Sequence, residues 1–183
     1  MIENIEKTSH WSQYVKDGAS DSNLLKEAFT QAFLNIDVTL RTFQGENSRD
    51  TSGCTSVTAM ITPKFIICAN AGDSRCVMGT NNTAKAMSED HKPNDELEQR
   101  RIEAAGGRVQ WKRVDGDLAV SRGLGDFHYK NRSDLTQGEQ KVIDKLYCQL
   151  FSSLLSNHRI DCVLEAVSFR PRYFFYSTFD FLI

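Results

Sequence analysis

The sequence lacks close cysteine pairs, long apolar runs and a marked excess of charge of either sign. Its five cysteines include no CxxC pair, and an odd number leaves at least one unpaired in any disulfide scheme, which favours a reducing compartment. The formal net charge of -2 gives no general attraction to nucleic acid or to an anionic membrane. No segment is apolar for long enough to cross a bilayer, and the N-terminus has no secretory apolar run. We therefore expect an intracellular monomer, cytoplasmic or nuclear, with no nucleic-acid and no membrane partner.

What the chain does contain is typical of one globular domain. It has 183 residues, of which 40% are hydrophobic and 25% are charged. This length suffices for one real core and is too short for two comfortable domains. Internal repeats and low-complexity tracts are absent from the sequence.

One long amphipathic helix is predicted near the N-terminus. Apolar residues recur at steps of three and four from Leu25 to Phe43, which is the spacing of a single helical face. Asp21 or Ser22 can cap the start of this helix. The apolar face must be buried against another layer.

Strands are predicted in the middle of the chain, at residues 54–61, 65–70 and 75–79. The turn that contains Gly72 and Asp73 reads as the tip of a β-hairpin between the second and the third strand. This pattern predicts a three-stranded antiparallel meander, with residues 85–88 as a fourth strand. The carboxylate of Asp73 at a strand end could face a cleft or a cation.

A second helix and a hairpin are predicted after the strands. Asn94 can cap a helix that Gly106 ends by adopting a left-handed conformation. Residues 109–114 alternate as a strand, Asp115-Gly116 is a hairpin signal, and residues 118–120 return. Apolar residues at helical spacing then run from residue 143 to residue 155, before an aromatic, aggregation-prone end at residues 173–183.

Five short motifs follow one another in the central part of the chain. They are GCT at residues 53–55, GDSR at 72–75, DHKP at 90–93, RIEAAGG at 101–107 and LAVSRGLGD at 118–126. This succession resembles the middle of the metal-dependent protein phosphatases of the 2C type (the PPM family), whose pattern runs GCT/GST, GDSR, DHKP, RIxxAGG and LAVSRxxGD. The resemblance covers roughly residues 24–142.

The resemblance implies both a fold and an activity. The family fold is an α+β arrangement, an α/β/β/α sandwich of antiparallel sheets flanked by helices, which we expect to be incomplete here at both ends. Family members hydrolyse phosphoserine and phosphothreonine in proteins with a pair of Mg²⁺ or Mn²⁺ ions. The chain is thus divided into a partial phosphatase domain, 1–142, and a divergent tail, 143–183. The tail is interpreted as a product of splicing, intron retention or a frame change, or alternatively as a lineage-specific extension.

Only one residue of the family's metal site has a counterpart here. Asp73 matches the family aspartate that contributes to an additional, weaker metal position at the edge of the cleft. The Arg plus Glu-Asp, Asp-Gly-His-Gly-Gly, Asp-Gly-Ile-Trp-Asp and Gly-x-x-Asp-Asn elements are absent. We therefore assign Asp73 as a metal ligand, assign no catalytic residue, and leave the substrate-binding residues open.

Three other polar residues receive structural interpretations. His91 is expected to order the turn before the second helix rather than to bind a metal. Asp126 with Arg122 could clamp phosphate, but a role in shaping the flap and its strand is favoured. Asp37, in a segment that resembles the family's FLxxD, is expected to be a solvated or capping carboxylate.

The sequence supports three readings of function. The leading one is a truncated serine/threonine phosphatase domain that is weakly active or inactive, because two-metal catalysis needs several converging carboxylates. The second is a catalytically silent binding or regulatory module of the same fold. The third is a product without function, whose exposed apolar strands lead to degradation.

Overall fold

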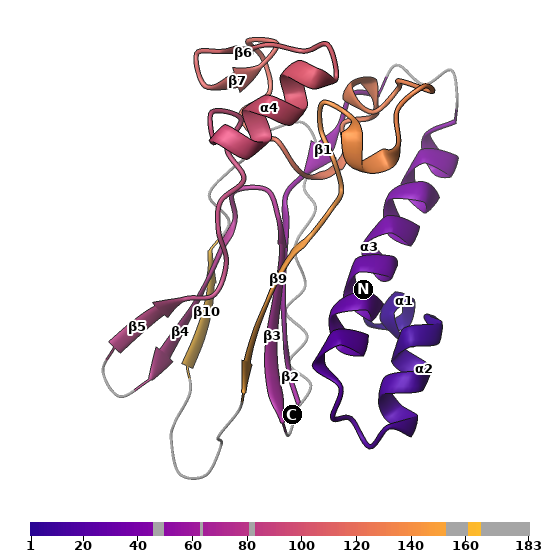
Figure 1. Ribbon diagram of the computed structural model, residues 1–183, viewed down its shortest axis with the longest axis vertical. Coiled ribbons are helices and arrows are strands. Elements are labelled where there is room, and N and C mark those ends of the chain that lie inside the picture. The colour runs from indigo at the N-terminus through magenta and orange to yellow at the C-terminus, as the bar shows by residue number, and fades with distance from the viewer. Residues whose placement is uncertain (46–49, 63, 81–82, 153–160, 166–183) are drawn as a thin grey trace.

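The protein is a stack of one helical layer and two β-sheets. The computed structural model describes residues 1–45, 50–62, 64–80, 83–152 and 161–165. Within these ranges, the N-terminal helices cover one face of a central sheet, and a second sheet lies on the opposite side (Figure 1). None of the described helices combines the length and the apolar character that a membrane span requires.

The helical layer consists of α1 (Ile2–Glu6), α2 (Ser9–Lys16) and the long α3 (Ser22–Gln44). Asp21 caps α3 by accepting a hydrogen bond from the backbone N–H of Asn23 at 2.8 Å. This confirms the predicted helix and its cap. The first half of the predicted apolar face is fully buried, at Leu25, Ala28, Phe29, Ala32 and Phe33. The second half is not, since Ile36 and Leu40 are half-buried and Phe43 is 83% exposed.

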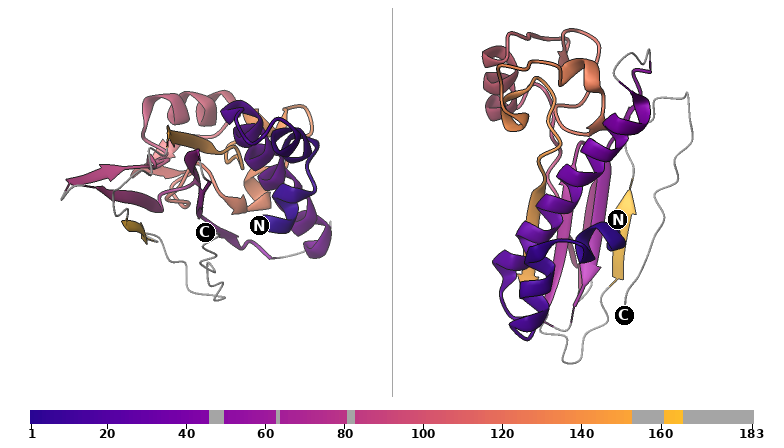
Figure 2. Two further views of the ribbon diagram at one scale, coloured as in Figure 1. Left: turned by 90° about the horizontal axis from the view of Figure 1, so that it is seen from below. Right: turned by 90° about the vertical axis from the view of Figure 1, so that its right-hand side faces the viewer.

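Both sheets are three-stranded and antiparallel. The central sheet has the order β2-β3-β9, with β2 at Ser56–Ile61, β3 at Phe65–Ala71 and β9 at Tyr147–Ser152. The second sheet has the order β10-β4-β5, with β10 at Asp161–Glu165, β4 at Arg75–Thr80 and β5 at Thr83–Ala86. Figure 2 shows α3 running alongside the central sheet, so the predicted α+β sandwich is confirmed.

The predicted hairpin at Asp73 is wrong, and so is the three-stranded meander. Strands β3 and β4 belong to different sheets, so the turn between them carries the chain from one layer to the other. Both edges of β3 are taken by β2 and β9, and β3 is also covered on both faces. Ile67 and Ala69 pack into the cluster formed with α3, whereas Ile66 and Cys68 pack between the two sheets. The predicted fourth strand exists as β5, slightly earlier in the chain than expected.

The predicted helix after residue 143 is wrong where the structure describes it. Strand β9 pairs with β3 along its whole length, for example Leu150 with Ile67. Its side chains alternate, since Cys148 and Leu150 pack toward the α3 cluster while Phe151 packs between the sheets. The end of the predicted helix, 153–155, and the aromatic end, 173–183, lie outside the described residues. The division of the chain at residue 142 stays a prediction.

One end of the sandwich carries short elements around a small separate core. They are β1 (Gly53–Cys54), α4 (Glu96–Ala104), β6 (Val109–Gln110), β7 (Arg113–Val114), β8 (Leu124–Gly125) and the 3-10 turns Phe127–Tyr129 and Gln137–Glu139. Strand β1 pairs with β8, and β6 pairs with β7 (Figure 1). The core of this end is formed by Ile102, Val114, Leu118, Val120, Tyr129 and Val142.

Two turns follow one another in this end of the molecule, one between β6 and β7 and one directly after β7. Strands β6 and β7 are joined by Trp111 and Lys112, so Trp111 lies in a turn and not in the predicted strand. The turn at Asp115-Gly116 is confirmed, because the backbone N–H of Val114 donates to the carbonyl of Leu118 at 2.8 Å. The two turns leave the β6–β7 hairpin projecting from the end of the molecule (Figure 1).

Candidate functional site

The turn between β3 and β4 requires glycine at its first position. Gly72 has a φ of +110°, and a Cβ there would overlap the side chain of Thr55 and lie 3.2 Å from the carbonyl oxygen of Arg122. A side chain would therefore be strained and would collide with the neighbouring loops. The glycine lets the chain turn sharply from one sheet to the other and places Asp73 at the junction.

Two buried polar side chains fix this turn. The Nδ2 group of Asn70 donates to the carbonyl oxygens of Gly72 at 3.0 Å and of Glu89 at 2.8 Å. The Nδ1 atom of His91 accepts a hydrogen bond from the backbone N–H of Gly72 at 3.1 Å. Burial, with a smaller contribution from the charge of Arg122, lowers the pKa of His91 to about 4. His91 is thus neutral at pH 7 and orders the turn, as predicted.

Asp73 presents one carboxylate oxygen without a hydrogen-bond partner in the part of the chain that the structure describes. Its side chain is buried, since the residue is only 3% exposed. The Oδ2 atom accepts a hydrogen bond from the ammonium of Lys92. The Oδ1 atom accepts none from any of the described residues. Because an unpaired buried carboxylate oxygen is costly, this atom is suited to receive a ligand from outside the described part of the chain.

A complete metal centre is not formed by the residues that the structure describes. Mg²⁺, for example, is bound in octahedral geometry, usually by one or two carboxylates together with phosphate and water oxygens. Across the described ranges, no three side chains of the His, Cys, Asp or Glu type gather into a group that could hold a metal. The chemistry of Asp73 fits one ligand position, but the described donor set does not fit a pair of metal ions.

Helix α4 is tied to its surroundings through the buried carboxylate of Glu98. Glu98 accepts hydrogen bonds from Arg101 at 2.7 Å, from the hydroxyl of Ser121 at 2.6 Å and from Arg122. Burial alone would raise the pKa of this carboxyl, but the hydrogen bonds from Arg122 and Ser121, with the two positive charges, lower it to about 2. Glu98 lies in the first turn of α4, where the helix dipole favours an acid, but it was not singled out from the sequence. Its spacing of three from Arg101 was the available signal.

Arg122 and Asp126 do not form a pair that could clamp phosphate. The guanidinium of Arg122 is held by Glu98 and by the carbonyl oxygen of Lys145 at 3.2 Å. The carboxylate of Asp126 packs on Gly53, where a Cβ would overlap it. Both residues therefore shape the loops around β1 and β8, in line with the favoured interpretation.

The expectation that Asp37 is a solvated or capping carboxylate is wrong, because Asp37 is buried in the interior of α3. This residue is 3% exposed and forms an ion pair with Lys130 at 3.0 Å. Its other oxygen accepts a hydrogen bond from the backbone N–H of Gly125 at 2.8 Å. The cause is tertiary, since α3 lies against β8 and both partners of Asp37 come from β8 and the segment after it.

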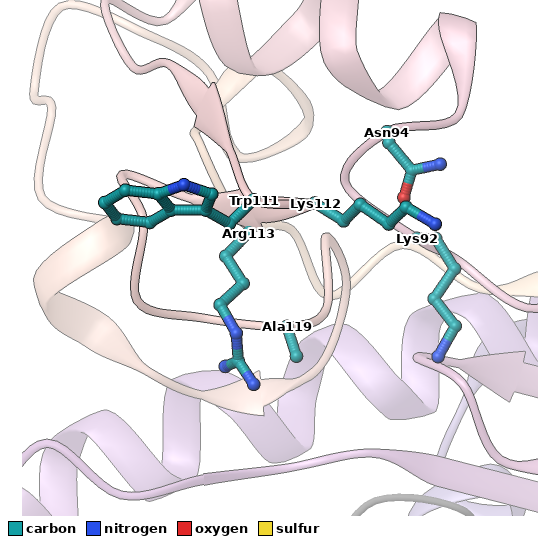
Figure 3. A pocket seen from close by; sticks show the side chains of 6 residues that line it. All are labelled: Lys92, Asn94, Trp111, Lys112, Arg113 and Ala119. Carbon is teal, nitrogen blue, oxygen red and sulfur yellow. The ribbon is translucent and has the colours of Figure 1, made fainter.

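A pocket of about 360 Å³ opens beside the Asp73 turn and is lined in part by the turn of the β6–β7 hairpin (Figure 3). Its lining consists of Lys92, Asn94, Trp111, Lys112, Arg113 and Ala119. The side chain of Lys112 extends toward Asn94. Arg113 lies on the opposite side of Ala119 from Lys92 (Figure 3). Lys92 lines the pocket and also contacts Asp73, so the pocket adjoins the turn.

The architecture is that of a known class of phosphatases. The crystal structure of serine-threonine phosphatase 2C from Toxoplasma gondii superposes with a TM-score of 0.71, at 21% identity, over 87% of this chain and 59% of that one. The fold is thus the sandwich seen in that class.

Comparison of sequences gives the family itself. Residues 2–156 match the family described as Protein phosphatase 2C, to which this chain belongs. The match extends beyond residues 24–142 on both sides. Protein phosphatase 2C homolog 2 of Schizosaccharomyces pombe is 48% identical over 117 residues, covering 63% of this chain and 31% of that protein. A probable protein phosphatase 2C of Caenorhabditis elegans is 41% identical over 139 residues, covering 76% and 38%. The chain therefore spans about a third of the length of these relatives.

Proposed function

We propose that this chain forms part of a phosphatase domain that hydrolyses phosphoserine and phosphothreonine in proteins, with Asp73 as one ligand of a Mg²⁺ or Mn²⁺ ion. The observation that carries the proposal is the buried Oδ1 atom of Asp73, which has no hydrogen-bond partner among the described residues. Membership of the protein phosphatase 2C family supports the same reaction class. Such an ion supplies a positive charge that stabilises phosphoryl transfer.

The role of Asp73 is tested by metal binding alone. Titration of the chain with Mn²⁺, followed by electron paramagnetic resonance, should detect a weak site that Asp73→Asn removes. Asp17→Asn is the matched control, because Asp17 is an exposed carboxylate at the end of α2. Equal Mn²⁺ binding by the Asp73→Asn variant and the unchanged chain would contradict the assignment.

We further propose that the 183-residue chain is weakly active or inactive by itself. The support is the lack of any three-residue group of metal-binding side chains among the described residues. A phosphothreonine peptide with millimolar Mn²⁺ should therefore show no metal-dependent release of phosphate above background. Metal-dependent turnover that Asp73→Asn abolishes would overturn this expectation.

A catalytically silent binding or regulatory module is the second candidate. It is favoured by the pocket between Lys92 and Arg113, which is formed entirely by described residues. This reading predicts that the chain retains phosphoproteins without hydrolysing them. The monomeric state and the cytoplasmic or nuclear location stay predictions, of which the first is tested by size-exclusion chromatography with light scattering.

A further inference from the structure

We propose that the pocket beside Asp73 binds an anionic side chain, a carboxylate or a second phosphate, that lies near the scissile phosphate in a substrate peptide. This rests on the proposed function, because it assigns a substrate preference to the same region of the molecule. Three of the six lining residues are cationic, namely Lys92, Lys112 and Arg113, and none is acidic. A concave surface with this lining attracts anions and disfavours cations.

The available positive charge comes chiefly from the β6–β7 hairpin. The charge of Lys92 is shared with Asp73, which it contacts. Arg113 is anchored at the pocket edge, because its Nη1 atom donates to the carbonyl oxygen of Asp117 at 2.6 Å. The exposed ammonium of Lys112 contacts no carboxylate within the described part of the chain. Lys112 and Arg113 are therefore placed to form charge-assisted hydrogen bonds with an incoming anion.

Trp111 adds an apolar surface next to these charges. It is 85% exposed, although a large aromatic side chain is usually at least partly buried. Its ring lies over Gly116, where a Cβ would come within 3.3 Å of Cζ3. Aromatic and arginine side chains are enriched where proteins bind other chains, since they combine contact area with directed polar groups. This combination suits a peptide better than a free phosphate ion.

The backbone of the turn between β6 and β7 is strained, which indicates that its two side chains have a role in binding. Trp111 and Lys112 have φ values of +51° and +61°, in a two-residue hairpin turn that usually contains Asn-Gly. Non-glycine residues at positive φ are strained, and such strain clusters at binding sites. The turn thus holds a tryptophan and a lysine over the pocket at the expense of local stability.

The proposal is tested with labelled peptides and the whole chain, without metal, by fluorescence anisotropy. Four peptides are compared: one with a single phosphothreonine among neutral residues, the same with a nearby glutamate, the same with a nearby phosphoserine, and an unphosphorylated neutral one. We expect the second anion to lower Kd by about tenfold, the size of one charge-assisted hydrogen bond. The glutamate and phosphoserine peptides distinguish the two sources of the anion.

Two charge-removing variants locate the effect. Lys112→Gln should reduce the advantage of the second anion by about threefold to tenfold, because it removes an exposed charge without disturbing the fold. Lys16→Gln is the matched control, since it removes an exposed lysine from α2, at the other end of the molecule (Figure 1). Equal Kd values for all four peptides, or equal effects of the two variants, would overturn the proposal. Since no turnover or metal is measured, loss of the phosphatase function would leave this result unchanged.

Discussion

Helix α3 meets the central sheet through side chains without charge, whereas helix α4 adds a buried carboxylate and two guanidinium groups to the apolar contacts of Ile102. At the first contact, Phe29 and Phe33 pack on Ile67 and Ala69 of β3. At the second, Glu98 binds Ser121 and Arg122, which belong to one other segment, and Arg101 of its own helix. The two regions therefore use different interactions to join a helix to the rest of the fold.

The apolar and the charged contacts differ more in how precisely they fix the position of a segment than in how much they stabilise the fold. Hydrophobic burial is non-directional and scales with area, so it can hold layers together while tolerating small shifts. Hydrogen-bonded ion pairs are directional, and they fix the loops that carry the candidate site. Thus the backbone of Arg122 packs on Gly72, and the N–H of Ser121 donates to the carbonyl of His91 at 3.2 Å. The charged region positions the Asp73 turn, and the apolar region keeps the domain folded.

The largest effect is expected in the apolar region. Phe33→Ala leaves a cavity between α3 and β3, since Phe33 is fully buried, and should lower the free energy of unfolding by about 3–5 kcal/mol. Phe43→Ala on the same helix is the control, because Phe43 is 83% exposed and should change it by about 0.5 kcal/mol or less. Urea denaturation followed by circular dichroism measures both. Similar losses for the two variants would contradict the packing of α3 on β3.

In the charged region we expect a smaller loss of stability, and one that depends on pH. Glu98→Gln should lower the free energy of unfolding at pH 7 by about 2–3 kcal/mol, since two half-buried guanidinium groups lose their buried, charged partner. The folded-state pKa of about 2 lies below the ordinary 4.5, so Glu98 stabilises the fold above pH 4.5. This contribution is lost as the pH falls toward 2. The difference between the variant and the unchanged chain should therefore shrink over that window in urea titrations.

Glu96→Gln provides the comparison on the same helix. Glu96 forms an exposed pair with Arg100, and such pairs contribute about 0–1 kcal/mol. The Glu96→Gln variant should show neither a marked loss of unfolding free energy at pH 7 nor a changed dependence of that free energy on pH below 4.5. If Glu98→Gln behaved like Glu96→Gln, the charged network would not be what holds α4 in place.

The apolar region was largely predictable from the sequence. Steps of three and four along α3 and the cap at Asp21 are local signals, and both are confirmed. The sheet partners of β3 and β4 were not predictable from the turn at Gly72, because a glycine-aspartate turn fits a hairpin and a change of sheet equally well. Strand β9 was mistaken for a helix, since a short apolar run carries little periodicity of its own.

The charged region shows where sequence reasoning reaches its limit. The motif around His91 is structural, as predicted. Two of the three partners of Glu98, Ser121 and Arg122, lie more than twenty positions away, and so do both partners of Asp37. Such contacts have no local pattern. The assignment of Asp73 as a metal ligand came from family resemblance, and its geometry is compatible with one ligand position.

The smallest effect concerns the turn that the charged region presents to solvent. Lys112→Gly should raise the free energy of unfolding by about 0.5–1 kcal/mol, because glycine tolerates the positive φ of this position without steric strain. Lys112→Ala is the control, since it removes the same charge but keeps a Cβ and therefore the strain. Thermal unfolding by calorimetry compares the two variants at equal protein concentration. A gain by Lys112→Gly alone means that the turn gives up stability to display a lysine over the pocket; equal stabilities would mean that the backbone there is relaxed.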